Sequence, residues 1–134
     1  MFKERLVKIK DVFGKDKNSL YEKVYSIYDP DGKVIYVGRA DKQNVAQRIA
    51  GHISHIFATD RPSKLSKYLF ENHPDYFDWE LKIYETSDVS TMIGQTFSCN
   101  QCAETALYLH LKNSGNQPVC NASQPSGKCT CKRT

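Results

Sequence analysis

The stretch from Val24 to His52, VYSIYDPDGKVIYVGRADKQNVAQRIAGH, organises the rest of the chain. Val24–Tyr28 and Val34–Gly38 are rich in β-branched and aromatic residues, and residues 29–32 between them, Asp-Pro-Asp-Gly, are typical of a turn. The pattern predicts a β-hairpin whose second strand ends at Gly38, where the backbone can turn sharply.

The two faces of this hairpin follow from its alternation. Side chains along a strand point to opposite faces in turn, so we expect Tyr25 and Ile27 on one face and their sequence neighbours on the other. On the return strand, Val34 and Tyr36 should share a face.

A helix is predicted to follow the hairpin. Asn44 is a suitable N-cap, and Gln47 stands three residues later, as in a capping box. Arg48 and His52 are one turn apart and fall together beside the apolar stripe of this helix. The stripe consists of Val45, Ile49, Ile53 and Ile56.

These residues resemble the GIY-YIG nuclease family. Residues 23–25, Lys-Val-Tyr, stand where the family has Gly-Ile-Tyr, and residues 36–38, Tyr-Val-Gly, stand where it has Tyr-Ile-Gly. Lys23 in place of the first glycine is the clear departure. The hairpin looks closest to the nuclease module of bacterial excision-repair enzymes. Arg48 and His52 resemble the helix arginine and its His/Tyr partner in restriction-type members.

The segments around this stretch have simpler patterns. Residues 1–22 are charged with a few apolar positions, which predicts an N-terminal arm or short helix. Residues 57–78 form a helical insertion, expected to pack outside the sheet, with a helix over Ser63–Asn72. The alternation over Trp79–Glu85 predicts a third, half-buried strand. The polar stretch Ser87–Ser98 is expected to be a loop.

The last segments complete the expected fold. Asn100–Asn113 is a strong helix with Gly115 as its stop, and residues 122–134 form a basic tail. We therefore predict a single domain over residues 1–134. Its fold class is α/β, of the α+β kind, with a small three-stranded antiparallel sheet flanked by helices. The resemblance implies the same GIY-YIG nuclease-like fold.

Glu104 is the strongest site signal outside the hairpin. On a helical wheel it lies between Leu107, Tyr108 and Leu111 rather than on the polar face. A carboxylate beside an apolar stripe is costly unless it is paired or binds a metal ion. It is therefore either a boundary glutamate that reaches water or a lysine, or a metal ligand. The resemblance implies the second, with Mg²⁺ or Mn²⁺ held by Glu104.

The resemblance also implies how phosphodiester hydrolysis would proceed. Arg48 would hold a phosphate oxygen through a charge-assisted contact. Tyr36 is the candidate general base, and because a free tyrosine has a pKa of about 10, it needs Arg39 and the metal ion to lower that value. His52 would receive or relay the proton, or orient the water.

Two further residues complete the candidate set. Tyr25 is expected to contact the phosphate or the water. Asn121 matches the family's late asparagine. The candidate catalytic residues are thus Tyr25, Tyr36, Arg39, Arg48, His52, Glu104 and Asn121.

Each of these residues taken alone has a plainer explanation. Two tyrosines in a hairpin are usually cross-strand packing, and an arginine and a histidine one turn apart are usually on the surface. The ordered set is far more specific than any member. The leading function is a metal-dependent DNA endonuclease. The alternatives are a nucleic-acid-binding module without turnover and a zinc-stabilised interaction protein.

The five cysteines carry a separate hypothesis. Cys-x-x-Cys followed by later cysteines is compatible with a structural zinc site. The alternative is that all five are plain reduced thiols, since a disulfide needs an oxidising compartment. The candidate zinc ligands are Cys99, Cys102, Cys120, Cys129 and Cys131.

Composition limits the remaining possibilities. The chain has 134 residues, with 19 Lys and Arg against 15 Asp and Glu, a net charge of +4 that is compatible with DNA as partner. No apolar run approaches the ~20 residues of a membrane span, and Met1–Arg5 does not resemble a signal peptide. We expect a cytoplasmic protein of restriction, phage or mobile-element kind, without a small-molecule cofactor. A small domain buries little DNA surface, so either a homodimer or broad specificity is expected.

Overall fold

The computed structural model describes residues 5–13, 20–58 and 63–121. The basic tail at residues 122–134, with Cys129 and Cys131, lies outside the described residues. So does part of the N-terminal segment 1–22. No helix among the described residues is both long enough and apolar enough to cross a membrane.

The described chain forms one antiparallel sheet. Its strands are β1 (Arg5–Lys8), β2 (Val24–Tyr28), β3 (Val34–Arg39) and β4 (Glu80–Tyr84), in the order β1-β4-β2-β3. The α+β class is confirmed, and so are the hairpin and the third predicted strand. The prediction of three strands was wrong, because β1 adds a fourth strand at the edge of β4.

The extra strand comes from the segment expected to be an arm or short helix. Within the part of this segment that the structure describes, the helix is limited to Ile9–Val12, the single turn α1. Strand β1 has four residues, which is too short for its alternation to be distinguished from a helical pattern in the sequence. What makes it a strand is its pairing with β4, a contact that no local pattern encodes.

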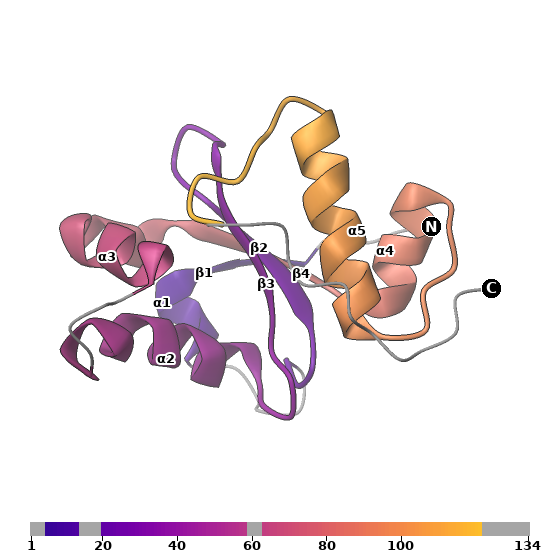
Figure 1. The fold of residues 1–134 in the computed structure, drawn as a ribbon. Helices are drawn as coiled ribbons and strands as arrows, with labels where there is room; N and C mark the ends of the chain where they lie inside the picture. Colours follow the sequence, from indigo (N-terminus) through magenta and orange to yellow (C-terminus); the bar gives the residue numbers. More distant parts are fainter. Residues whose placement is uncertain (1–4, 14–19, 59–62, 122–134) are drawn as a thin grey trace.

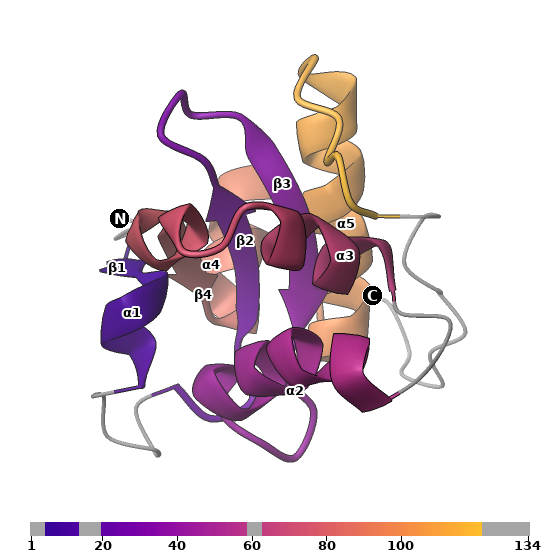
Figure 2. The ribbon, with the colours of Figure 1, turned by 90° about the vertical axis from the view of Figure 1, so that its left-hand side faces the viewer.

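Helices cover both faces of the sheet (Figures 1 and 2). On one face lie α1, α2 (Val45–Ala58) and α3 (Lys64–Glu71), followed by a 3₁₀ turn at Asp75–Asp78. On the other face lie α4 (Thr86–Ile93) and α5 (Asn100–Asn113). Helix α4 was missed, since Ser87–Ser98 was predicted to be a loop.

Helix α4 is stabilised by its caps and by one buried side chain, although its composition is that of a loop. Its residues are mostly polar, but Glu85 and Asp88 form a capping box, each side chain accepting from the other's backbone N–H. Val89 is fully buried, and the helix ends at Gly94 in the left-handed conformation. One buried side chain and two good caps are enough for a helix of two turns once α5 is beside it.

A β-bulge in the hairpin interrupts the alternation of side chains that the sequence predicted. The register shifts between Ile27, which pairs with Tyr36, and Tyr28, which pairs with Val34. Two successive residues of β3, Ile35 and Tyr36, therefore pack on the α2 face, while Val34 lies in the cluster on the α5 face. The expectation that Val34 and Tyr36 share a face was wrong. The bulge is what turns Tyr36 toward Tyr25 and α2.

Gly38 has a different role from the one expected. It does not end the strand, since β3 continues to Arg39. A Cβ atom built on Gly38 would lie 2.6 Å from a ring carbon of Tyr36 and 2.7 Å from the hydroxyl of Tyr25. Glycine is needed here because two aromatic rings pass directly over the backbone.

The described part of the predicted insertion, residues 63–78, contributes to the core rather than lying outside it. Leu65 and Leu69 of α3 are almost fully buried and pack in one cluster with Ile27 and Ile35 of the sheet. The predicted boundaries of this helix are confirmed, with Ser63 as its N-cap.

The outer edge of β3 is covered by the segment after α5. The backbone amides of Val119 and Cys120 donate to the carbonyls of Val34 and Ile35 at 3.2 and 2.7 Å. The side chain of Asn121 then continues the pairing along β3. The strand that carries Tyr36 is therefore held on both sides.

Candidate active site

Helix α2 begins as the sequence predicted. The Asn44 side chain accepts from the Gln47 amide at 2.8 Å, and the Gln47 side chain accepts from the Asn44 amide at 3.0 Å. This reciprocal capping fixes the start of the helix beside the end of β3. Arg48 and His52 are thereby presented from the first two turns of α2.

Two tyrosines and a histidine form an aromatic layer under α2. The ring centroids of Tyr25 and Tyr36 lie 6.2 Å apart, and those of Tyr36 and His52 lie 5.3 Å apart, edge to face. The hydroxyl of Tyr25 and Nε2 of His52 are 3.4 Å apart. Tyr25 is completely buried, whereas Tyr36 is partly exposed.

The protonation states in this layer are set mainly by burial. Burial raises the pKa of Tyr36, and the opposing positive charge comes mainly from Arg48 rather than Arg39. Burial likewise raises the pKa of Tyr25 well above its usual value. Burial and the Arg48 charge lower the pKa of His52 to about 3. At neutral pH both tyrosines are therefore phenols, and His52 is a neutral, weak base.

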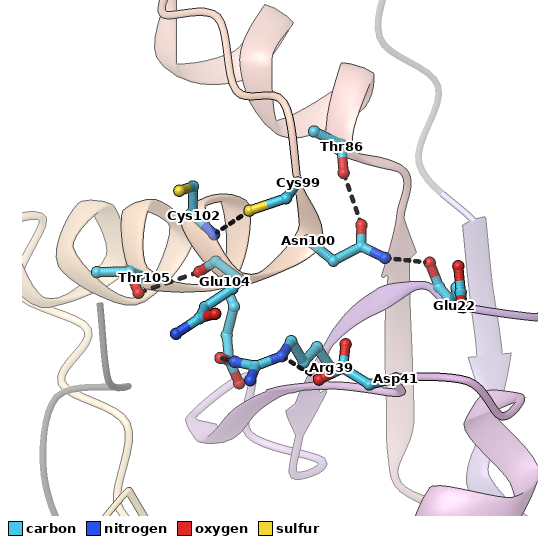
Figure 3. A network of polar contacts seen from close by, with 10 residues as sticks. Glu22, Arg39, Asp41, Thr86, Cys99, Asn100, Cys102, Glu104 and Thr105 are labelled. Carbon is cyan, nitrogen blue, oxygen red and sulfur yellow. Dashed lines mark hydrogen bonds and ion pairs between the residues drawn. The ribbon is translucent and has the colours of Figure 1, made fainter. Parts of the chain in front are cut away.

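A guanidinium joins two carboxylates at the end of β3 (Figure 3). Nε of Arg39 donates to Oδ2 of Asp41 at 2.6 Å, and Nη1 of the same side chain donates to Oε1 of Glu104 in a short ion pair. Burial raises the pKa of Glu104, while the charge and hydrogen bond of Arg39 counteract this. Glu104 is thus buried, as the sequence indicated, and its partner is Arg39.

The start of α5 is tied to the sheet, which places Glu104. Cys99 is the N-cap, and its Sγ accepts from the Cys102 amide at 3.4 Å. Asn100 donates to the backbone carbonyl of Glu22 and accepts from the Thr86 hydroxyl, both at 2.6 Å (Figure 3). These contacts hold the first turn of α5 between the start of β2 and α4.

A hollow of about 350 Å³ opens where β3, α2 and α5 meet. Its two arginines and two carboxylates carry opposite charges that cancel at neutral pH. Four predicted site residues line it, and Asp41 and Gln43 were missed. Their only sequence signal is their place in the short loop between the strand and the capped helix. The lining residues are Tyr36, Arg39, Asp41, Gln43, Arg48 and Glu104.

The other predicted site residues lie behind or beside the hollow. Tyr25 and His52 form the buried layer behind Tyr36. Asn121 lies on the outer edge of β3, where its side chain accepts from the Val37 amide and donates to the Val37 carbonyl, both at 3.0 Å. The structure therefore gives Asn121 a backbone-holding role at the site's margin.

The donor atoms around the hollow fit a hard divalent cation. Glu104, Asp41, Gln43 and Tyr36 offer only oxygen ligands, which suit Mg²⁺ or Mn²⁺ bound with most of its waters retained. Among the described residues, no cluster of three or more His, Cys, Asp or Glu side chains is arranged to hold a metal ion. A cation here would rely on one or two carboxylates, and Arg39 now occupies both.

The described cysteines lie on opposite faces of the sheet. Cys99 and Cys102 belong to the cluster under α5, whereas Cys120 is buried in the cluster under α2. Burial raises the pKa of Cys120 to about 11, which keeps it a thiol. The structure does not bring these three predicted zinc ligands together, and Cys129 and Cys131 lie outside the described residues.

Compared with known proteins, the chain matches no family model, no curated protein and no solved structure. Any assignment of function therefore depends on the residues and geometry of the hollow.

Proposed function

We propose that this protein is a metal-dependent DNA endonuclease of the GIY-YIG type. One observation supports this above the others: Tyr36, Arg39, Arg48 and Glu104 converge on one hollow from a strand and two helices. Arg39 and Glu104 are 65 positions apart in the sequence. Cross-strand packing or a surface ion pair does not require four such groups around one open space.

The two arginines would bind the scissile phosphate. Arg48 reaches the hollow from α2, and its positive charge opposes the burial that raises the pKa of both phenol groups. A guanidinium presents a planar fork of N–H donors that matches two phosphate oxygens. Arg39 has further N–H groups beyond those that bind Asp41 and Glu104, so it can contribute to the same anion.

The tyrosine would act through hydrogen bonding rather than as a preformed base. Because the pKa of Tyr36 is raised, its hydroxyl can donate to a phosphate oxygen or orient a water molecule. His52 stays neutral at working pH, and its Nε2 lies 3.4 Å from the Tyr25 hydroxyl within the buried layer. We therefore propose that His52 positions Tyr36 from the buried layer behind it rather than relaying protons.

A divalent cation would complete the charge balance. The hollow is neutral by count of its arginines and carboxylates, whereas a phosphodiester anion needs net positive surroundings. When bound at Glu104, Mg²⁺ or Mn²⁺ would supply that charge and acidify a water molecule.

Cleavage of supercoiled plasmid tests this proposal. Wild-type protein with Mg²⁺ or Mn²⁺ should nick or linearise the plasmid, and chelator should abolish the reaction. Glu104→Gln keeps the size of the side chain but loses the charge, so it should be at least ~100-fold slower. Glu80→Gln, on an exposed position of β4, is the matched control and should cleave normally. Absence of cleavage by wild type on plasmid, branched DNA, single strands and RNA would contradict turnover.

A second function has its own observation. Arg39 already binds Glu104, and neither Tyr36 nor His52 is poised as a base at neutral pH. A module that binds nucleic acid without cutting it would have these properties. DNA binding by wild type that is unchanged by Mg²⁺, with no product under any condition, would favour this alternative.

A further inference from the structure

Asp41 lies on the loop between β3 and α2, and its carboxylate is bonded to the Arg39 guanidinium. The bond uses Nε of Arg39, whereas Glu104 is bonded through Nη1. The two carboxylates therefore do not compete for the same N–H group. The Asp41 side chain is 58% exposed and that of Glu104 is 9% exposed, so one end of this bridge faces water and the other faces the core.

The charges of Asp41, Arg39 and Glu104 do not balance. One guanidinium is paired with two carboxylates, so the three groups together carry one negative charge. A divalent cation at Glu104 would repel Arg39. If Glu104 were its only anionic partner, Arg39 would either keep Glu104 and exclude the cation or leave the hollow.

We propose that Asp41 is a positioning residue that retains Arg39 at the wall of the hollow while Glu104 takes up a divalent cation. The inference rests on the proposed function and assigns a role to a residue outside the predicted site. Through Nε, Asp41 holds the guanidinium in place, and the Nη groups then become available to the phosphate. An arginine suits this purpose because its separate N–H groups bind different partners at once.

The affinity of Mn²⁺, measured by titration calorimetry without DNA, tests the proposal independently of cleavage. Asp41→Asn leaves Arg39 with Glu104 as its only full counter-charge, so Mn²⁺ should bind about tenfold more weakly. Asp41→Glu, which restores the charge, should recover most of that loss. Asp31→Asn, in the turn at the far end of the hairpin, is the matched control and should bind Mn²⁺ as wild type does.

A double-mutant cycle tests whether Asp41 affects Mn²⁺ affinity through Arg39. If Asp41 acts through Arg39, Asp41→Asn should change Mn²⁺ affinity less than about twofold in a protein that also carries Arg39→Gln. An equal loss in both backgrounds would overturn the proposal, since Asp41 would then be a direct ligand or a general charge. No loss in either background would overturn it as well, because Asp41 would then be an ordinary surface partner.

Wild-type protein offers a second test that needs no substitution. The Nε–H proton of Arg39 can be followed by nuclear magnetic resonance as Mg²⁺ is added. The proposal requires this proton to stay protected from exchange with water when Mg²⁺ saturates the protein. Loss of its protection on Mg²⁺ binding would overturn the proposal.

The outcomes separate this inference from the proposed function. Cleavage without coupling between Asp41 and Arg39 would contradict the proposed role of Asp41 and support the nuclease function. Coupling in Mn²⁺ binding without cleavage of any nucleic acid would contradict the nuclease function and support the role of Asp41 in retaining Arg39. Absence of both Mn²⁺ binding and cleavage would contradict both proposals.

Discussion

Gly38 shows how a single missing side chain allows the site to form. The rings of Tyr25 and Tyr36 pass so close to it that any Cβ would overlap both of them. The glycine of a motif is commonly explained by a turn, but this one lies inside a strand. Because it has no Cβ, the two rings can pack against the sheet, with Tyr36 in the wall of the hollow.

Substitution of Gly38 should therefore be costly for stability. We expect Gly38→Ala to lower the free energy of unfolding by about 2–3 kcal/mol, because the two rings must move apart. Gly51→Ala is the matched control: it lies in α2 with open space around it and should stabilise the protein by about 0.5–1 kcal/mol. Urea unfolding measures both. Equal urea midpoints for Gly38→Ala and wild type would contradict this prediction, because the two rings would then have moved apart without loss of stability.

The buried His52 should make stability depend on pH. An unfolded chain binds a proton on this histidine near pH 6.5, whereas the folded chain binds it only near pH 3. As pH falls through this window the unfolded state gains the proton first, so the free energy of unfolding falls by up to about 1.4 kcal/mol per pH unit.

His52→Gln removes this contribution while an amide remains near Tyr25. Between pH 6.5 and 5, wild type should lose about 1.5 kcal/mol more than the variant, as measured by urea unfolding at each pH. Glu104 is present in both proteins, so its opposite dependence cancels from the difference. Parallel pH curves for the two proteins would contradict burial of a neutral His52.

At the scale of elements, the segment 119–121 acts as a short additional partner of β3. Asn121 makes two hydrogen bonds to the Val37 backbone, in the manner of a neighbouring strand. This edge carries Tyr36 and Arg39, so its position matters for the hollow. The similarity to a family motif marked this asparagine, but only the structure shows that it acts on backbone atoms.

Removal of the Asn121 side chain should loosen that edge. We expect Asn121→Ala to lower the free energy of unfolding by about 1–2 kcal/mol, because two buried backbone groups lose their partners. Asn116→Ala, on an exposed loop position, should stay within ~0.5 kcal/mol of wild type. Thermal and urea unfolding of both variants provide the measurement. A stable Asn121→Ala protein that has lost cleavage would instead favour a direct catalytic role.

The elements also show how far the sequence could predict this fold. The hairpin, α3, β4, α5 and the start of α2 were predicted within a residue or two, because their periodicity and caps are local signals. Strand β1 and helix α4 were not, because each depends on a neighbour distant in sequence. The same limit applies to the site: Tyr36, Arg48 and Glu104 were identified individually, but the bulge and the Asp41 bridge were not.

At the scale of the whole molecule, the balance of charge in the hollow should control DNA binding. Glu104→Gln changes its net charge from zero to positive. Without divalent ions, at about 0.1 M salt, this variant should bind duplex DNA about tenfold more tightly than wild type, although it is the variant expected to lose cleavage. Fluorescence anisotropy with a labelled duplex and chelator measures the affinity, and Glu80→Gln is the control. Unchanged affinity would mean that DNA does not approach Glu104.

The long-range contacts of the site also bear on when it appears during synthesis. Arg39 meets Glu104 across 65 positions, and Val37 meets Asn121 across 84. Hairpins and helices close in microseconds, whereas such distant pairings form late because a long loop must first be closed. The hairpin and α2 can therefore fold as they leave the ribosome, while the hollow does not exist until residues 100–121 have been made. A nascent chain that lacks these residues therefore cannot perform the chemistry of the hollow.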